Sequence, residues 1–282
     1  MPLTTLVDAA TLAAHVADPA WAVVDCRFSL DDESWGERNY RERHIPGATY
    51  GHLDRDLCGP TTGSNGRHPL PSAEILGKTF SRFGIDAGIQ VVAYDQDAGI
   101  FASRLWWLLR WLGHDAAAVL DGGLAAWISE GRQTASGVES RASRTFLGAP
   151  RTEMTVGADE VAARALQDDW RLVDGRSPER FRGEMETIDR VAGHIPGAVN
   201  HFFRRNLGDG GSFLSPEQLR KELREATDGV SSDHVVCYCG SGVTACQNLL
   251  ALAHAGIRDA KLYPGSWSEW SSDPTRPVGK GS

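Results

Sequence analysis

The sequence of 282 residues predicts an α/β protein with two tandem domains, each a parallel sheet with helices on both faces. Two observations lead to this prediction. A series of short landmarks occurs twice in the same order, and within each copy short apolar runs alternate with segments of helical periodicity. Strands that alternate with helices form parallel sheets whose faces are both covered. Hydrophobic residues make up 41 % of the chain, which suffices for two cores and argues against disorder.

Four pairs of landmarks reveal the internal repeat. They are WAVVDCR (21–27) and WRLVDGR (170–176), HIPGA (44–48 and 194–198), VVAYD (91–95) and VVCYC (235–239), and DGGLAAW (121–127) and PGSWSEW (264–270). The stretch between the copies is rich in Gly, Ser, Thr and Arg and lacks periodicity, which is typical of a linker. We therefore place the first domain at residues 1–140, the linker at 141–154 and the second domain at 155–282.

Each copy is expected to contain the same order of elements. In the first copy, helical spacing predicts helices at 11–18 and 101–113, and short apolar runs predict strands at 21–25, 91–95 and within 117–123. In the second copy, the corresponding helices are expected at 157–169 and 243–256, and the strands at 171–174, 235–239 and 261–265. Ligands of such sheets bind beyond the carboxyl ends of the strands.

Charge and composition exclude several functions. The net charge of −8 argues against a nucleic-acid surface, which needs a basic face, but is compatible with a small anionic substrate. The first residues lack the pattern of a signal peptide, and no apolar run approaches the roughly 18 residues of a membrane span. Five cysteines without a disulfide spacing favour a reducing cytoplasm.

Comparison of the two copies points to Cys239 as the reactive group. This thiol follows a strand and precedes a helix, whereas the first copy carries Asp95 at the same place and is predicted to be catalytically inactive. Gly240 and Gly242 let the backbone curl, so that successive amide groups can converge on one point. The N-terminus of the following helix adds partial positive charge, and both effects favour a thiolate.

The other cysteines are predicted to have structural roles, because cysteine is often buried as a small hydrophobic residue. Cys26 and Cys237 lie within strands, and Cys246 lies one turn into a helix. Cys58, in a polar loop, fits either reading. The histidines of the two HIPGA landmarks occur in both copies, which indicates an architectural role. The tryptophans are expected in the core.

The loop CGSGVT (239–244) and the HIPGA landmarks resemble the rhodanese superfamily, and most closely its mercaptopyruvate sulfurtransferases. The resemblance covers essentially the whole chain. It implies that Cys239 takes sulfur from a donor as a persulfide, held by the amides of Gly240, Gly242, Val243 and Thr244. An acceptor such as cyanide, a small thiol or thioredoxin then removes the sulfur, and neither a metal nor an organic cofactor is implied. Thiosulfate-using members usually carry basic residues where this chain has Gly240 and Ser241, so mercaptopyruvate is favoured.

The resemblance also implies partners for the thiol. Asp56 and His68, in a loop that is longer in the first copy than in the second, would form a polar relay with Ser241 across the domain interface. Arg180 falls where the family places its first substrate arginine, and a guanidinium matches the donor's carboxylate. The second arginine is expected at position 189, but this chain has Asp189 there. Arg190 is the candidate replacement.

Other functions remain open at the level of sequence. Thiosulfate is an alternative donor. A cysteine phosphatase or arsenate reductase would carry arginine six residues after the cysteine, where this chain has Ala245. A non-catalytic persulfide carrier would need only Cys239, and a redox protein could pair Cys237 with Cys239.

Overall fold

The computed structural model describes residues 1–227 and 229–281, and these form two compact units. The first unit contains Met1–Cys58, Pro71–Arg151 and Asp209–Phe213; the second contains Gly59–Leu70, Thr152–Gly208 and the chain from Leu214 onward. The main division therefore falls after Arg151. It differs from a division into contiguous domains because two short segments pack with the opposite unit. One of them is Gly59–Leu70, which includes His68.

The first unit contains a five-stranded sheet in the order β1-β5-β4-β2-β3, with every pair parallel. Its strands are β1 (Leu6–Val7), β2 (Trp21–Asp25), β3 (Thr49–Tyr50), β4 (Gln90–Tyr94) and β5 (Ala117–Leu120). Its helices are α1 (Ala9–His15), α2 (Trp35–Glu42), α3 (Leu53–Asp56), α4 (Ala73–Arg82), α5 (Ala102–Trp111) and α6 (Gly123–Ser129).

The second unit contains a four-stranded parallel sheet in the order β7-β6-β8-β9. Its strands are β6 (Arg171–Asp174), β7 (Val199–Asn200), β8 (Val235–Tyr238) and β9 (Lys261–Leu262). Its α-helices are α7 (Ala158–Arg164), α8 (Pro178–Arg182), α9 (Pro216–Glu222), α10 (Arg224–Thr227), α11 (Ala245–His254) and α12 (Ser266–Trp270). Single 3-10 turns lie at Thr152–Met154, Phe203–Asn206 and Ser232–His234.

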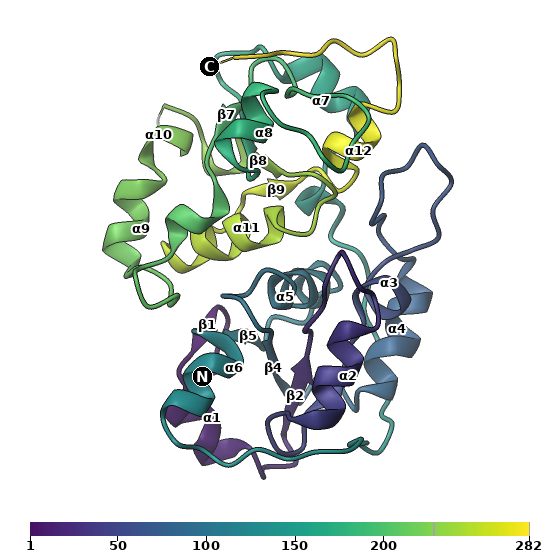
Figure 1. The fold of residues 1–282 in the computed structure, drawn as a ribbon, viewed down its shortest axis with the longest axis vertical. Coiled ribbons are helices and arrows are strands. Elements are labelled where there is room, and N and C mark those ends of the chain that lie inside the picture. Colours follow the sequence, from purple (N-terminus) through teal and green to yellow (C-terminus); the bar gives the residue numbers. More distant parts are fainter. Residues whose placement is uncertain (228, 282) are drawn as a thin grey trace. The chain divides into compact units, whose positions relative to one another are not determined.

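Helices cover both faces of each sheet, as the sequence predicts (Figure 1). In the second unit, alternate residues of β8 pack in a core cluster with Val161 of α7 and Trp267 of α12. Helix α11 contacts β8 and β9. In the first unit, β4 packs in a cluster with α1 and α6, while α5 also contacts it. Because both faces are buried, central strands such as β4 carry no polar alternation.

The repeated landmarks serve the same architecture in both units. Asp25 at the end of β2 forms a buried ion pair with Arg27 at 2.7 Å. Asp174 at the end of β6 repeats it with Arg176 at the same distance. Each arginine also donates to a backbone carbonyl, that of Arg43 or Gly193. These matched networks explain why the sequence VD-x-R recurs.

The HIPGA histidines also have matched structural roles. His44 and His194 are buried, and each Nδ1 hydrogen-bonds a backbone carbonyl, of Tyr40 at 2.7 Å and of Phe181 at 2.8 Å. Their shared geometry agrees with the architectural role predicted from their presence in both copies. Within the part of the chain that the structure describes, no helix has the length and apolar character needed to cross a membrane.

Candidate active site at the Cys239 loop

The loop from Cys239 to Thr244 connects β8 to α11 in the second unit. The Cys239 side chain is 1 % exposed, and the amide of Gly242 donates to its Sγ at 3.2 Å. The thiol therefore lies at the carboxyl end of a central strand, inside a turn of backbone that directs an N–H group at the sulfur. An anionic sulfur is favoured by such donors.

The loop requires glycine at position 242. Its φ of +79° lies in the left-handed region, and an added Cβ would come within 2.4 Å of the Pro264 carbonyl oxygen. This close approach brings the segment before α12 against the loop. There, the Cys239 amide donates to Ser266 Oγ at 3.2 Å, and the amide of Trp267 donates to the Cys239 carbonyl at 3.0 Å. The backbone on both sides of the thiol is thus fixed.

The equivalent loop of the first unit already binds a negative charge. Asp95, at the end of β4, accepts hydrogen bonds from four backbone amides, those of Asp97, Gly99, Phe101 and Ala102, at 2.7–3.0 Å. Burial raises the pKa of Asp95, and the four amides oppose that shift. Two copies of one strand–loop–helix design therefore place a carboxylate in one unit and a thiol in the other. This pattern supports an anion-binding role for the Cys239 loop.

Ser241 and His68 lie together within the second unit. Ser241 Oγ and His68 Nδ1 are 2.7 Å apart and share a hydrogen bond, and both side chains are buried. The sequence assigns His68 to the first domain, but segment Gly59–Leu70 packs with the second unit. This part of the predicted relay is therefore formed inside one unit, and the correction follows from the path of the segment rather than from the identity of its residues.

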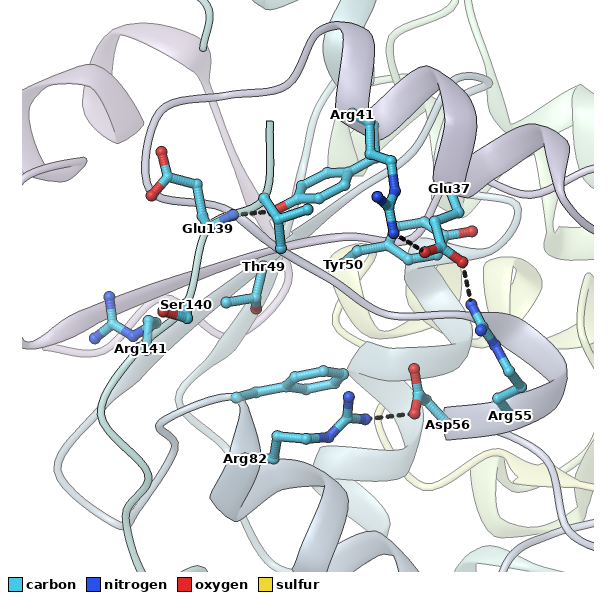
Figure 2. A pocket seen from close by; sticks show the side chains of 13 residues that line it. Glu37, Arg41, Thr49, Tyr50, Arg55, Asp56, Arg82, Glu139, Ser140 and Arg141 are labelled. Carbon is cyan, nitrogen blue, oxygen red and sulfur yellow. Dashed lines mark hydrogen bonds and ion pairs between the residues drawn. The ribbon is translucent and has the colours of Figure 1, made fainter. Parts of the chain in front are cut away.

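Asp56 lies at the end of α3 in the first unit. Its carboxylate accepts from the His52 amide at 2.9 Å and pairs with Arg82. It lines a cavity of about 460 Å³, together with Tyr50, Arg82 and other polar residues (Figure 2). His52 and Arg82 both belong to the unit of Asp56, and its role in the relay stays a prediction.

Arg180, on the short helix α8, forms part of a buried charge cluster. Its guanidinium pairs with Glu186 at 2.8 Å and with Asp189 at 3.1 Å. Burial opposes the ionisation of Glu186, but hydrogen bonds from Arg180 and from the amides of Asp189 and Ile188 hold its pKa below the ordinary value. Asp189 also pairs with Arg67. Burial raises the pKa of Asp189, although Arg67 opposes this shift.

Arg190, which lies outside the Cys239 loop, differs in solvent exposure from the loop residues Val243 and Thr244. The side chain of Arg190 is exposed to solvent. Val243 is buried and Thr244 is half-buried at the start of α11.

The other cysteines are buried thiols. Burial raises the pKa of Cys237 and of Cys26, and it raises the pKa of Cys58 to about 12. Cys58 is thus a core residue rather than part of a polar surface. Raised pKa values disfavour the thiolate that a redox partner for Cys239 would need.

Three residues beside the loop are not among the site residues that the sequence predicts. Arg67 lies next to His68 and faces Gly240. Ser266 and Ser268 lie in the PGSWSEW landmark and hold the loop backbone and the amide of Arg67. In the partner landmark DGGLAAW the two serines correspond to Gly123 and Ala125, but three further positions also differ, so the sequence does not single out the serines.

Comparison with known proteins gives matches over the whole chain. A family model described as "Rhodanese-like domain" matches twice, at residues 8–130 and 157–273. A probable 3-mercaptopyruvate sulfurtransferase of Pseudomonas aeruginosa is 47 % identical over 283 residues, covering 100 % of both chains. A putative thiosulfate sulfurtransferase of Mycobacterium tuberculosis is 42 % identical, covering 98 % of this chain and 97 % of its own. The human 3-mercaptopyruvate sulfurtransferase is 37 % identical and covers 86 % and 84 %.

Solved structures agree with these matches. The 3-mercaptopyruvate sulfurtransferase of Leishmania major superposes with a TM-score of 0.82 at 32 % identity, covering 95 % of this chain and 74 % of that one. SseA from Escherichia coli, described as a 3-mercaptopyruvate sulfotransferase, has a TM-score of 0.81 at 30 % identity, with 94 % of this chain and 99 % of that chain covered.

Proposed function

This chain belongs to the rhodanese-like domain family, and we propose that it takes sulfur from 3-mercaptopyruvate and carries it as a persulfide on Cys239. The named relatives confirm the predicted class of enzyme, a sulfurtransferase. The observation that carries the proposal is the thiol of Cys239 at a strand end, with the Gly242 amide directed at its sulfur and Ser241 of the same loop hydrogen-bonded to His68.

In the first half-reaction, the Cys239 thiolate attacks the sulfur of mercaptopyruvate. A new S–S bond forms, the donor's C–S bond breaks, and the electron pair of that bond goes to the donor carbon. The adjacent carbonyl delocalises this charge as the enolate of pyruvate, which then takes a proton. The enzyme retains Cys239 as a persulfide, so that the cysteine acts as a covalent catalyst.

The Ser241 hydroxyl is the group best placed to assist the carbonyl. Its hydrogen bond to His68 lets the pair stabilise the enolate oxygen or move a proton to the product. We assign Asp56 to the same relay on the resemblance alone. Arg180 is the proposed partner of the donor's carboxylate, because its guanidinium lies beside Gly240.

In the second half-reaction, an acceptor anion attacks the outer sulfur of the persulfide. The S–S bond breaks, the outer sulfur leaves bonded to the acceptor, and the Cys239 thiolate is restored. The amides of Gly240, Gly242, Val243 and Thr244 are the proposed donors to the persulfide. Cyanide, a small thiol and reduced thioredoxin are the proposed acceptors.

We also propose that the enzyme works in the cytoplasm. None of the five cysteines forms a disulfide within the described residues, and a catalytic thiol needs a reducing compartment.

Steady-state assays with two donors test the proposal. Purified enzyme is given mercaptopyruvate or thiosulfate, with cyanide as acceptor, and thiocyanate is measured. We expect kcat/KM to be at least about 10-fold higher for mercaptopyruvate, because the loop lacks the basic residues that suit a doubly charged donor. The Cys239→Ser variant is the control and should be inactive with both donors. A preference for thiosulfate would contradict the donor assignment and favour the name carried by the Mycobacterium tuberculosis relative.

A further inference from the structure

Two guanidinium groups converge beside the residue that follows Cys239. A methyl group placed on the Cα of Gly240 would lie 3.0 Å from Arg67 Nη2 and 3.6 Å from both terminal nitrogens of Arg180. Gly240 itself contributes no side chain between them and the loop. All three residues belong to the second unit, so the geometry is internal to it.

Arg67 is held in this position from two sides. Its amide donates to Ser268 Oγ at 3.1 Å, which ties its backbone to α12. Its Nη1 pairs with Asp189, whose side chain is 5 % exposed, while Nη2 is directed toward Gly240. Asp189 also pairs with Arg180. One buried carboxylate therefore holds both guanidiniums beside the loop.

Asp189 explains why the second guanidinium beside Gly240 can belong to Arg67, which comes from segment Gly59–Leu70. Two close guanidiniums repel each other unless a carboxylate lies between them. Here, Asp189 replaces the arginine that the family resemblance predicts at that position, and a cation from segment Gly59–Leu70 lies against it. Arg190, the neighbour that could substitute by a shift of one residue, is exposed.

We propose that Arg67, together with Arg180, binds the donor's carboxylate, and that Asp189 positions Arg67 for this task. The inference rests on the proposed function, since it names the residue that recognises the donor at the same site. Arg67 would then determine specificity for a donor with a planar carboxylate. Asp189 acts only through the arginines and is a positioning residue.

The charge balance of the cluster bears on donor choice. The guanidiniums of Arg67 and Arg180 pair with the carboxylates of Glu186 and Asp189. Arg176 also contacts Glu186, and its charge is offset by Asp174, so the cluster carries no net charge. A single carboxylate can be recognised by the directed N–H groups of the arginines. A compact dianion lacks that planar match, and it receives no excess positive charge here.

The test separates KM from kcat in the full-length enzyme. Arg67→Ala should raise the KM for mercaptopyruvate by about 10- to 100-fold, the effect of losing one charged hydrogen-bond partner, with kcat changed less than about 3-fold. The inhibition constant of pyruvate, which has the same carboxylate but no sulfur, should rise by a similar factor. Arg182→Ala is the matched control, because that arginine, the last residue of α8, pairs with Glu184 rather than with Asp189. Its KM should not change.

A rescue variant makes the test independent of folding defects. Arg67→Ala combined with Asp189→Arg returns a guanidinium to the cluster from position 189, and it should restore much of the lost affinity. Arg67→Lys should restore less, because an ammonium cannot bind a carboxylate bidentately. Asp189→Asn should raise KM while leaving kcat nearly unchanged.

The outcomes are distinct. A wild-type enzyme without activity on mercaptopyruvate would contradict the proposed function and, with it, this inference. An active wild type whose KM is unchanged in Arg67→Ala would overturn the role of Arg67 alone. A KM increase in Arg190→Ala but not in Arg67→Ala would assign the second contact to Arg190 instead.

Discussion

At the scale of single residues, Cys239 and Asp95 show what distinguishes the two copies. Both follow a central strand, and the loop before the next helix directs backbone amides at both side chains, four at Asp95 and that of Gly242 at Cys239. A carboxylate permanently occupies the donors in the first unit. In the second, the amide of Gly242 faces the thiol of Cys239, the proposed sulfur carrier. The same backbone design is therefore structural in one unit and suited to chemistry in the other.

The Ser241–His68 pair predicts strongly coupled mutational effects. Ser241→Ala and His68→Ala should each lower kcat/KM for mercaptopyruvate by about 100-fold, the scale of assistance by a positioned acid–base pair. The double variant should cost little more than either single change, because the two groups act as one unit. Ser64→Ala, an exposed position in the same segment, is the control. If the effects of the two substitutions multiply in the double variant, the two groups do not act as one unit. If both single variants retain activity, the relay is contradicted and a persulfide carrier is favoured.

Sequence comparison points to Cys239 as the candidate nucleophile, because only one copy carries a thiol at the strand end. It does not point to Arg67, whose partner Asp189 lies 122 positions away. Its role depends on where segment Gly59–Leu70 packs, and local pattern carries no information about that path. The sequence shows Asp189 where the family resemblance predicts an arginine. Only the three-dimensional structure shows that Arg67 pairs with this aspartate. Arg190 is predicted because it is adjacent to position 189 in the sequence. The ion pairs of Asp189, with Arg67 and Arg180, instead join residues that are close in space.

At the scale of elements, the connection between β8 and α11 forms the loop that holds Cys239. The sequence predicts a helix over 243–256, and α11 covers Ala245–His254. It starts two residues later because Val243 and Thr244 belong to the turn around the sulfur. Similarly, the strand predicted over 261–265 ends at Leu262. The segment after it turns at Pro264, whose carbonyl lies against Gly242.

Gly242 provides a test of this loop geometry. Gly242→Ala should lower the free energy of unfolding by about 1–3 kcal/mol, because a side chain at positive φ is strained, and it should abolish persulfide formation. Urea unfolding and single-turnover sulfur loading measure the two effects. Gly210→Ala is the control, since nothing lies within 4 Å of an added Cβ there, and its stability should change by less than about 0.5 kcal/mol. Normal loading of Gly242→Ala would show that the turn does not need this conformation.

At the scale of the whole molecule, the duplication made the fold predictable. Both sheets are parallel and covered by helices, and the repeated VD-x-R and HIPGA landmarks form matched buried networks in the two units. The repeat does not predict that two short segments leave the unit to which their position in the sequence would assign them. Segments Gly59–Leu70 and Asp209–Phe213 pack with the opposite units, and the first of them brings His68 and Arg67 to the Cys239 loop.

The central claim is that Cys239 accepts one sulfur atom from mercaptopyruvate. Single-turnover incubation followed by intact-protein and peptide mass spectrometry tests it most directly, with Cys239→Ser as the control. We expect one added sulfur atom, located on the peptide that contains Cys239, and faster loading from mercaptopyruvate than from thiosulfate. No added sulfur from either donor, or sulfur located on another cysteine, would contradict the account.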